Sequence, residues 1–303
     1  MDILKQFKAL SDPTRLRLAH ILDHFELNVN EIVSIVDMIQ SGVSRHLKIL
    51  LEAGLVASRK EGSYIYYSAK NTKQSQDLVS LVRARVENDS VFRGDISRAE
   101  QCILLRKSRA KRFFRTVAPQ WDRLKKEVLG EFDLNSLFIE NVMNQNIIAD
   151  LGCGTGELLE HFLGQSNAPL IGVDASPEML EQARIKLPER SCLELRLGEL
   201  ENLPMRDQEV DTAVMSMVLH HIFEPEKSIQ EVFRVLKPGG IFLLADFLRH
   251  DQEEIQKIIG GTWLGFTRKQ IQNWLLSCGF TLKSDSLFPV EKNLSITFYL
   301  AQK

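Results

Sequence analysis

The sequence predicts two domains of different class, a mainly α-helical unit at the N-terminus and an α/β unit with a mostly parallel sheet at the C-terminus. Residues 10–52 carry helical periodicities, whereas residues 147–247 carry short apolar runs at the spacing of strands that alternate with helices. A chain of 303 residues with 44% hydrophobic content can build about two domains. We expect domains at 1–90 and 113–303 with a helical linker at 91–112, because RVENDSVFRGD interrupts the helical patterns near residue 90.

The most informative segment is IIADLGCGTG, residues 147–156, in which an apolar run leads to an acidic residue and three alternating glycines. The run predicts a buried strand. Asp150, Gly152, Gly154 and Gly156 form the pattern DxGxGxG, in which the missing side chains allow close approach of a ligand and positive φ. The pattern resembles motif I of the class I S-adenosylmethionine-dependent methyltransferases.

Three further apolar runs end in candidate ligand loops. Residues 169–173 lead to Asp174, residues 193–197 to Glu199, and residues 210–217 to VLHHI. Loops at the carboxyl ends of strands converge in an open α/β sheet, so we expect one crevice. RVLKPGGIFLLADF then resembles the helix, turn and fifth strand of the same family. The runs near 280–287 and 294–301 predict a final antiparallel pair, which gives a Rossmann-like class I fold with a seven-stranded, mostly parallel sheet.

The resemblance implies S-adenosylmethionine as the cofactor and S-adenosylhomocysteine as product or effector. Asp150 would lie near the methionine amino group, Asp174 would accept hydrogen bonds from the ribose hydroxyls, and Glu199 would lie near the adenine. The implied cofactor-binding residues are Asp150, Gly152, Cys153, Gly154, Gly156, Asp174, Ala175, Ser176, Met179, Glu199, Leu200 and Met217. Asp174 could instead be a helix cap, with residues 175–177 a plain turn. We expect Cys153 to act as a small apolar residue rather than a nucleophile or metal ligand.

Two other enzyme classes fit this pattern less well. A nicotinamide-dependent dehydrogenase would carry GxGxxG, whereas this chain carries GCGTG. A DNA methyltransferase would carry a DPPY-like or NPPY-like phrase after the fourth strand, where MSMVLHHI stands here. The phrase RFFRTVAPQWDRL resembles the lead-in segment of small-molecule methyltransferases, which implies a small molecule as the methyl acceptor.

Methyl transfer requires mainly alignment of a nucleophile with the methyl group, and a base only when the nucleophile is protonated. His220, His221 and His250 are candidate bases because they follow the fourth and fifth strands. Each could equally be a packing or loop residue. Phe113, Phe114 and Trp121 could cover the cofactor or belong to a core, and residues 263–280 should shape the acceptor pocket.

The N-terminal unit begins with a helix-start signal, Asp12 followed by Pro13. Helices are expected at about 13–22, 31–38 and 41–52, the last ending at Gly54. Residues 55–69 then alternate like a β-hairpin. SDPTRLRL, SGVSRHLKILLEAGLV and this hairpin resemble the ArsR/SmtB family of winged helix-turn-helix repressors, over about residues 1–90.

The resemblance implies binding to operator double-stranded DNA through the helix at 41–52 and the hairpin. Residues 1–70 contain nine Lys and Arg against eight Asp and Glu, so a local stripe rather than bulk charge must contact phosphates. The implied DNA-binding residues are Ser41, Ser44, Arg45, His46, Lys48, Arg59 and Lys60. Ser41 is also expected to cap its helix, and His46 lies at the edge of the apolar face.

Metal sensing is not expected, since Asn28 and Asn30 stand in ELNVNEI where metal-sensing relatives carry cysteines, and the four cysteines form no CxxC pair. The helix at 74–86 is expected to pair in a homodimer, as a palindromic operator requires. The basic stretch 104–126 could contact DNA flanks, but we expect it to be a solvated face or to pair with acidic residues of its own chain. No signal peptide or membrane span is predicted, so a cytoplasmic location is expected.

These expectations lead to two hypotheses. In the first, the protein is a homodimeric DNA-binding regulator, acting as a repressor, whose C-terminal domain methylates a small molecule. In the second, the C-terminal domain does not catalyse, and its occupancy by S-adenosylmethionine or S-adenosylhomocysteine sets operator affinity.

Overall fold

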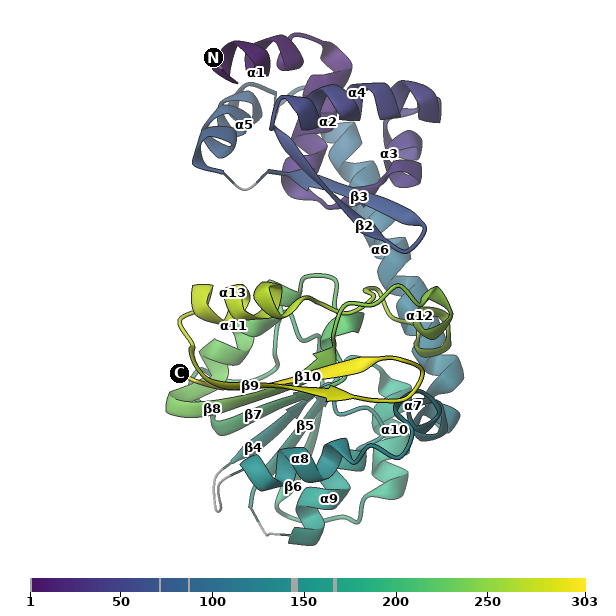
Figure 1. Cartoon of the computed structure of the whole chain (residues 1–303), viewed down its shortest axis with the longest axis vertical. Helices are drawn as coiled ribbons and strands as arrows, with labels where there is room; N and C mark the ends of the chain where they lie inside the picture. Colours follow the sequence, from purple (N-terminus) through teal and green to yellow (C-terminus); the bar gives the residue numbers. More distant parts are fainter. Residues whose placement is uncertain (1, 71, 87, 143–146, 166–167) are drawn as a thin grey trace. The chain divides into compact units, whose positions relative to one another are not determined.

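The computed structural model describes residues 2–70, 72–86, 88–142, 147–165 and 168–303, and it divides the chain into two compact units (Figure 1). The first unit extends to Arg109 and the second begins at Ala110. Each unit has its own hydrophobic core. No helix of the described residues is long and apolar enough to cross a membrane.

The N-terminal unit packs helices against a three-stranded antiparallel sheet with the order β1-β3-β2. Its elements are α1 (Asp2–Leu10), α2 (Pro13–His24), β1 (Leu27–Asn28), α3 (Val29–Val36), α4 (Gln40–Glu52), β2 (Val56–Glu61), β3 (Tyr64–Ala69), α5 (Lys73–Val86) and the first part of α6 (Ser90–Val117). The helix-turn-helix pair α3–α4 and the β2–β3 hairpin follow the predicted order.

Local capping explains where two of these helices begin. The Asp12 side chain accepts a hydrogen bond from the Arg15 amide, and Pro13 occupies the first turn of α2, as predicted. Asn28 and Glu31 form a capping box at the start of α3. The expected cap at Ser41 is wrong: α4 begins at Gln40, so Ser41 already lies inside its first turn, and no side chain caps this helix.

The N-terminal unit extends beyond the boundary expected at residue 90. In the first half of α6, Ala99 is buried in the N-terminal core, and buried Asp95 pairs with Arg17 at 2.7 Å. Arg106 of the same helix pairs with Glu31 of α3. The stretch expected to be a linker at 91–112 is therefore part of a 28-residue helix that contributes residues to both units.

The C-terminal unit is built on a seven-stranded, mostly parallel sheet, as predicted. The strand order is β6-β5-β4-β7-β8-β10-β9. The first five strands in this order are parallel, and β10 is antiparallel to both its neighbours. The strands are β4 (Ile148–Leu151), β5 (Leu170–Asp174), β6 (Leu193–Leu197), β7 (Val210–Ser216), β8 (Leu236–Phe247), β9 (Thr281–Pro289) and β10 (Ser295–Gln302).

Helices cover both faces of this sheet. One core contains side chains from α7 (Trp121–Leu129), α8 (Leu134–Asn141), α9 (Glu157–Gln165), α10 (Pro177–Lys186) and α12 (Glu253–Ile259). The other contains side chains from α11 (Pro225–Val235) and α13 (Arg268–Ser277). The remaining elements are the short 3-10 helices η1 (Ala118–Gln120) and η2 (Leu219–His221).

One local expectation in this sheet needs correction. The phrase LKPGG, expected as a turn before the fifth strand, lies within β8, which begins at Leu236. Leu236 pairs with Val210 and Ile241 pairs with Thr212, so β8 has three extra residues there that form a bulge. Gly239 adopts φ +78° within the bulge, which explains why a glycine-rich phrase can belong to a strand.

Candidate cofactor crevice and DNA-binding face

The glycine-rich turn joins β4 to α9, and its three glycines serve different purposes. Gly152, Gly154 and Gly156 all have positive φ. A Cβ atom on Gly152 would lie 2.3 Å from Val218 Cγ2, and one on Gly156 would lie 2.7 Å from Leu187 Cδ1. Both positions need glycine for packing. A Cβ atom on Gly154 would have its nearest neighbour at 3.6 Å, so the absence of a side chain there leaves room for a ligand to approach the backbone.

Asp174 lies at the end of β5, the strand next to β4, and its side chain bonds to the glycine-rich turn that follows β4. Its carboxylate accepts hydrogen bonds from the amides of Gly154 (2.9 Å) and Ser176 (2.8 Å). Ser176 in turn caps α10 by accepting from the Met179 amide at 3.2 Å. Desolvation raises the pKa of Asp174 to about 6. The carboxylate therefore holds both the glycine turn and the start of the next helix.

Asp150 is the most unusual group of the crevice, because it is a carboxylate that is 2% exposed. Within the described residues its Oδ1 atom has no hydrogen-bond partner. Burial raises the pKa of Asp150 to about 7, and nearby Lys125 opposes the shift. Lys125 itself forms an ion pair with Glu157. A buried carboxylate oxygen without a donor is poorly satisfied by the protein, and a cationic ligand group would satisfy it.

The remaining predicted cofactor residues lie around the same strand ends. Met217 follows β7 with φ +55°, and its amide donates to the Ala245 carbonyl at 2.9 Å. Leu200 is buried, whereas Glu199 is partly exposed and pairs with Lys111 at 2.7 Å. Cys153 lies in the apolar core, and burial raises the pKa of its thiol, which confirms that it acts as a small apolar residue.

An aromatic cluster packs beside the glycine turn. The Phe114 ring lies 4.9 Å from His221 and 5.6 Å from Trp121, between ring centroids. Trp121 Nε1 lies 3.6 Å from the position of a Cβ on Gly154. The neighbouring Asp122 accepts a hydrogen bond from Thr155 in the turn. Residues around position 121 therefore lie next to the crevice. The sequence alone does not decide whether these residues border the cofactor or belong to a core.

The three candidate histidines occupy different environments. His220 is buried, and its Nδ1 atom lies 2.8 Å from Asp246 Oδ1. Desolvation lowers the pKa of His221 well below its usual range. Burial lowers the pKa of His250 to about 4, and its Nδ1 accepts a hydrogen bond from the Gln252 amide. Sequence reasoning missed Asp246, although its place at the end of an apolar run, in ADF, was the available signal. Among the described residues, no three His, Cys, Asp or Glu side chains are grouped to hold a metal.

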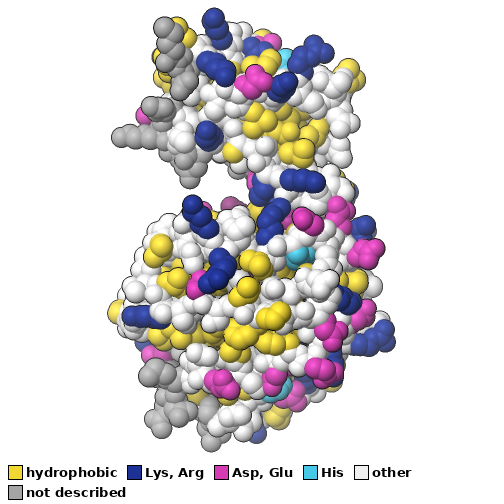
Figure 2. All heavy atoms as spheres, in the orientation of Figure 1, with side chains coloured by type: hydrophobic (Ala, Val, Ile, Leu, Met, Phe, Trp, Pro, Cys, Tyr) yellow, Lys and Arg dark blue, Asp and Glu magenta, His cyan; other side chains and the backbone are white. Residues whose placement is uncertain are grey.

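The predicted DNA-binding residues of α4 share one exposed face. Ser41, Ser44, Arg45 and Lys48 are exposed, whereas Val43, Leu47 and Leu50 are buried on the opposite side. His46 is half-buried and lies 3.7 Å from Asp12. Figure 2 shows Lys and Arg side chains gathered over the end of this unit that contains α1, α2 and α4. The α4 residues therefore form a basic, accessible stripe.

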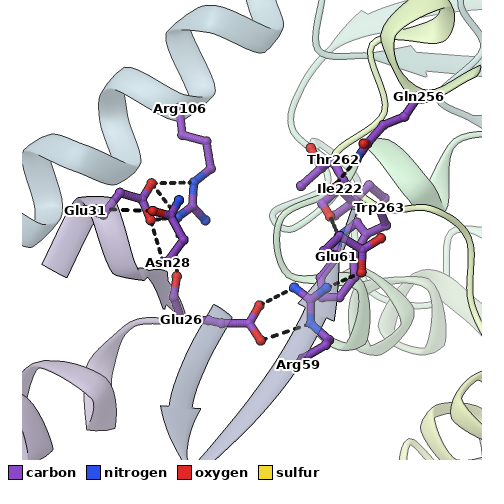
Figure 3. A network of polar contacts seen from close by, with 10 residues as sticks. All are labelled: Glu26, Asn28, Glu31, Arg59, Glu61, Arg106, Ile222, Gln256, Thr262 and Trp263. Carbon is purple, nitrogen blue, oxygen red and sulfur yellow. Dashed lines mark hydrogen bonds and ion pairs between the residues drawn. The ribbon is translucent and has the colours of Figure 1, made fainter. Parts of the chain in front are cut away.

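The hairpin cations differ from those of α4. Lys60 is exposed, but Arg59 is half-buried and pairs with Glu26 and Glu61 (Figure 3). The Arg59 guanidinium also lies 5.0 Å from the centroid of the Tyr66 ring. Arg59 thus stabilises the hairpin within its own chain, and its contact with DNA remains a prediction.

Part of the basic stretch 104–126 pairs with acidic residues of its own chain. Arg106, Lys111, Lys125 and Lys126 all form ion pairs with glutamates.

Comparison with protein families matches each unit separately. Residues 12–58 match the family of bacterial regulatory proteins of the arsR family, and residues 149–244 match a methyltransferase domain. The chain carries an ArsR-family DNA-binding domain followed by a methyltransferase domain. The first match contains the α4 stripe, and the second contains the glycine turn, Asp150 and Asp174.

Relatives of the methyltransferase domain share its sequence over about 125 residues. An uncharacterized methyltransferase from Synechocystis is 38% identical over 125 residues, which are 40% of this chain and 57% of the relative. The demethylmenaquinone methyltransferase of Desulfitobacterium hafniense is 34% identical over 127 residues, which are 40% of this chain and 49% of the relative. The chain thus spans about half the length of these curated relatives.

A solved structure shows the same fold. The cyclase SpnF superposes with a TM-score of 0.54 and 17% identity, over 63% of this chain and 94% of that protein. At this identity the likeness concerns the fold alone. The methyltransferase domain and its fold imply S-adenosylmethionine as the cofactor. The open backbone at Gly154 and the unsatisfied Asp150 Oδ1 fit a ligand that brings a cation to this turn.

Proposed function

We propose that the protein is a DNA-binding transcriptional regulator, acting as a repressor, whose methyltransferase domain transfers a methyl group from S-adenosylmethionine to a small molecule. The buried carboxylate of Asp150, whose Oδ1 atom has no hydrogen-bond partner among the described residues, lies beside an open glycine turn and carries this proposal. In it, Asp150 binds the ammonium group of the cofactor and Asp174 binds the ribose hydroxyls. Glu199 and Leu200 border the adenine, and Met217 lies beside the cofactor at the end of β7.

Calorimetry on the full chain tests the cofactor site. S-adenosylmethionine should bind the wild type, and Asp174→Ala should weaken binding by about ten-fold or more, because a charge-assisted hydrogen bond contributes roughly 1.5–3 kcal/mol. Glu181→Ala on the exposed face of α10 is the matched control and should leave affinity unchanged. Unchanged affinity in Asp174→Ala would remove the assignment of this carboxylate. Consumption of the cofactor with a metabolite extract then tests catalysis.

We also propose that the protein binds operator DNA as a homodimer in the cytoplasm. Leu81 of α5 is 55% exposed, and Ile3, Leu4 and Phe7 of α1 are each more than half exposed. Apolar side chains of this kind favour an interface between copies. Sedimentation analysis should give a dimer for the wild type and a shift toward monomer for Leu81→Glu. A monomeric wild type would contradict the proposal.

A second candidate function is sensing, in which cofactor occupancy changes operator affinity without need of catalysis. The observation that favours it is α6, whose Arg106 pairs with Glu31 of the helix-turn-helix and whose Phe114 packs on His221 in the methyltransferase domain. Binding to DNA upstream of the protein's own gene distinguishes the candidates at one fixed salt concentration. A severalfold shift with S-adenosylmethionine or S-adenosylhomocysteine supports sensing. Equal affinity under all conditions supports an enzyme joined to a repressor.

A further inference from the structure

His220 and Asp246 form a buried pair at the carboxyl ends of β7 and β8. The two side chains are 2% and 0% exposed, and His220 Nδ1 lies 2.8 Å from Asp246 Oδ1. The same carboxylate accepts hydrogen bonds from the amides of His220 (3.1 Å) and Phe247 (2.7 Å). A carboxylate held in this way favours a proton on Nδ1 of the imidazole, which leaves the lone pair on Nε2.

The Nε2 atom of His220 is buried and has no hydrogen-bond partner among the described residues. Buried polar atoms are nearly always bonded, so this acceptor is available to a donor that enters the site. His220 borders a cavity of about 10 Å³, which is room for roughly one oxygen atom. Its other lining residues are Trp121, Lys125, Val128, Leu129, Met217, Phe247 and Ile259.

The cavity lies next to the cofactor crevice. Trp121 and Met217 border both, since Trp121 approaches Gly154 and Met217 follows β7 at the same sheet edge. Apart from His220 and Lys125, the lining is apolar. Such a site disfavours a protonated amine, which would bring two or three donors to a single acceptor. A hydroxyl brings one donor, and Lys125 can stabilise negative charge that develops on its oxygen.

We propose that His220 is the general base for methylation of an acidic hydroxyl, a phenol or an enol, on an otherwise apolar acceptor, and that Asp246 is its positioning residue. This inference rests on the proposed methyltransferase function. The hydroxyl proton moves to Nε2, the oxygen forms a bond to the methyl carbon, and the sulfonium C–S bond breaks with its electron pair on sulfur. The proton then leaves His220 to solvent. The body of the acceptor displaces side chains that line the cavity.

4-Nitrophenol is a suitable probe because its phenolate absorbs visible light and its phenol does not. With the full chain and S-adenosylhomocysteine, below the solution pKa of the probe, the wild type should bind it as the phenolate. His220→Gln should lose the phenolate band and weaken probe binding by about ten-fold, as expected for loss of one charge-assisted hydrogen bond. Asp246→Asn should reduce the band. His161→Gln, on the exposed surface of α9, is the control and should keep it.

Two outcomes would overturn the inference: no bound phenolate in the wild type, or an equal band in His220→Gln. Should the variants fail to fold, the ¹⁵N spectrum of histidine-labelled wild type decides. A proton on Nδ1 of His220, with an Nε2 shift on addition of 4-nitrophenol, supports the inference, and a proton on Nε2 or no shift overturns it. Calorimetry with S-adenosylmethionine separates the two proposals. A wild type that does not bind the cofactor contradicts the proposed function, whereas a wild type that binds the cofactor but shows no phenolate band contradicts only the role of His220.

Discussion

In the proposed cofactor site Asp150 pairs with the ammonium group and must be ionised to do so, so the methyltransferase domain should bind S-adenosylmethionine in a strongly pH-dependent manner. Burial raises the pKa of Asp150 to about 7. Below that pH the free protein holds a proton on this carboxyl, and binding must release it. Affinity therefore falls as the pH falls through 7, which is the sign expected when the ligand prefers the deprotonated form.

The size of this effect follows from the single proton. With a pKa of about 7 in the free protein, the ionised fraction of Asp150 alone implies affinity about ten-fold weaker at pH 6 than at pH 8. Asp174, whose pKa is raised to about 6, adds to the loss of affinity below pH 6. Asp150→Asn should remove most of this dependence and weaken binding at pH 8. The same variant should stabilise the unliganded protein at pH 8 by up to ~4 kcal/mol. The reason is that the folded state loses free energy of unfolding as the pH rises from about 4 to 7, where the buried Asp150 must ionise, and asparagine carries no such charge.

Titration calorimetry at several pH values measures the cofactor affinity and the number of protons released on binding. Repeating each titration in buffers of different ionisation enthalpy counts the protons released, which should approach one per site near pH 6 in the wild type and fall in Asp150→Asn. Chemical denaturation of the unliganded proteins gives the stability difference. Affinity that is flat from pH 5.5 to 8, with no proton release, would refute the assignment of Asp150 to the ammonium group.

Four further substitutions test other parts of the structure. Gly154→Ala should reduce cofactor affinity by more than about ten-fold, because the new methyl occupies the ligand approach, and should cost only roughly 1–2 kcal/mol of stability through its positive φ, measured by calorimetry and urea unfolding. Gly164→Ala in α9, where a Cβ meets nothing within 4 Å, should leave affinity unchanged and stabilise by roughly 0.5–1 kcal/mol. Arg45→Ala should weaken operator binding and lower the salt slope by about one, in anisotropy titrations at several salt concentrations, while cofactor affinity stays constant. Asp95→Asn should destabilise the N-terminal unit by roughly 3–5 kcal/mol in urea unfolding, because Arg17 loses its buried partner, and a loss under 1 kcal/mol would show that this pair is dispensable.

The sequence predicts those features that depend on short-range patterns. Asp12 and Pro13 identify the start of α2, and alternation identifies the hairpin, because each signal lies within a few residues of the structure that it causes. The order of apolar runs predicts the sheet, since a parallel strand requires a crossover helix and a hairpin does not. The predicted crevice follows from the same rule, because Asp150 and Asp174 end neighbouring strands.

Features that depend on contacts between distant residues escape such reasoning. Asp95 of α6 can be buried because it pairs with Arg17. A sequence pattern based on apolar residues counts a charged residue as exposed, so it does not predict that this part of α6 is buried. The domain boundary was therefore expected near residue 90, whereas the structure divides after Arg109. Arg59 was assigned to DNA contact by its place in the hairpin, and nothing near it in the sequence shows that Glu26 lies within reach.

The His220–Asp246 pair shows what a known strand order adds to a motif. The two residues are separated by 26 positions, but β7 and β8 are adjacent and parallel, with Ser216 opposite Ala245. Residues that follow these two partners must therefore lie at the same sheet edge. The sequence contains three candidate histidines without a way to rank them, since rank depends on which one meets a carboxylate. Once the order is known, His220 is the candidate whose Nδ1 lies against a carboxylate and whose Nε2 has no hydrogen-bond partner among the described residues, an arrangement that suits a base.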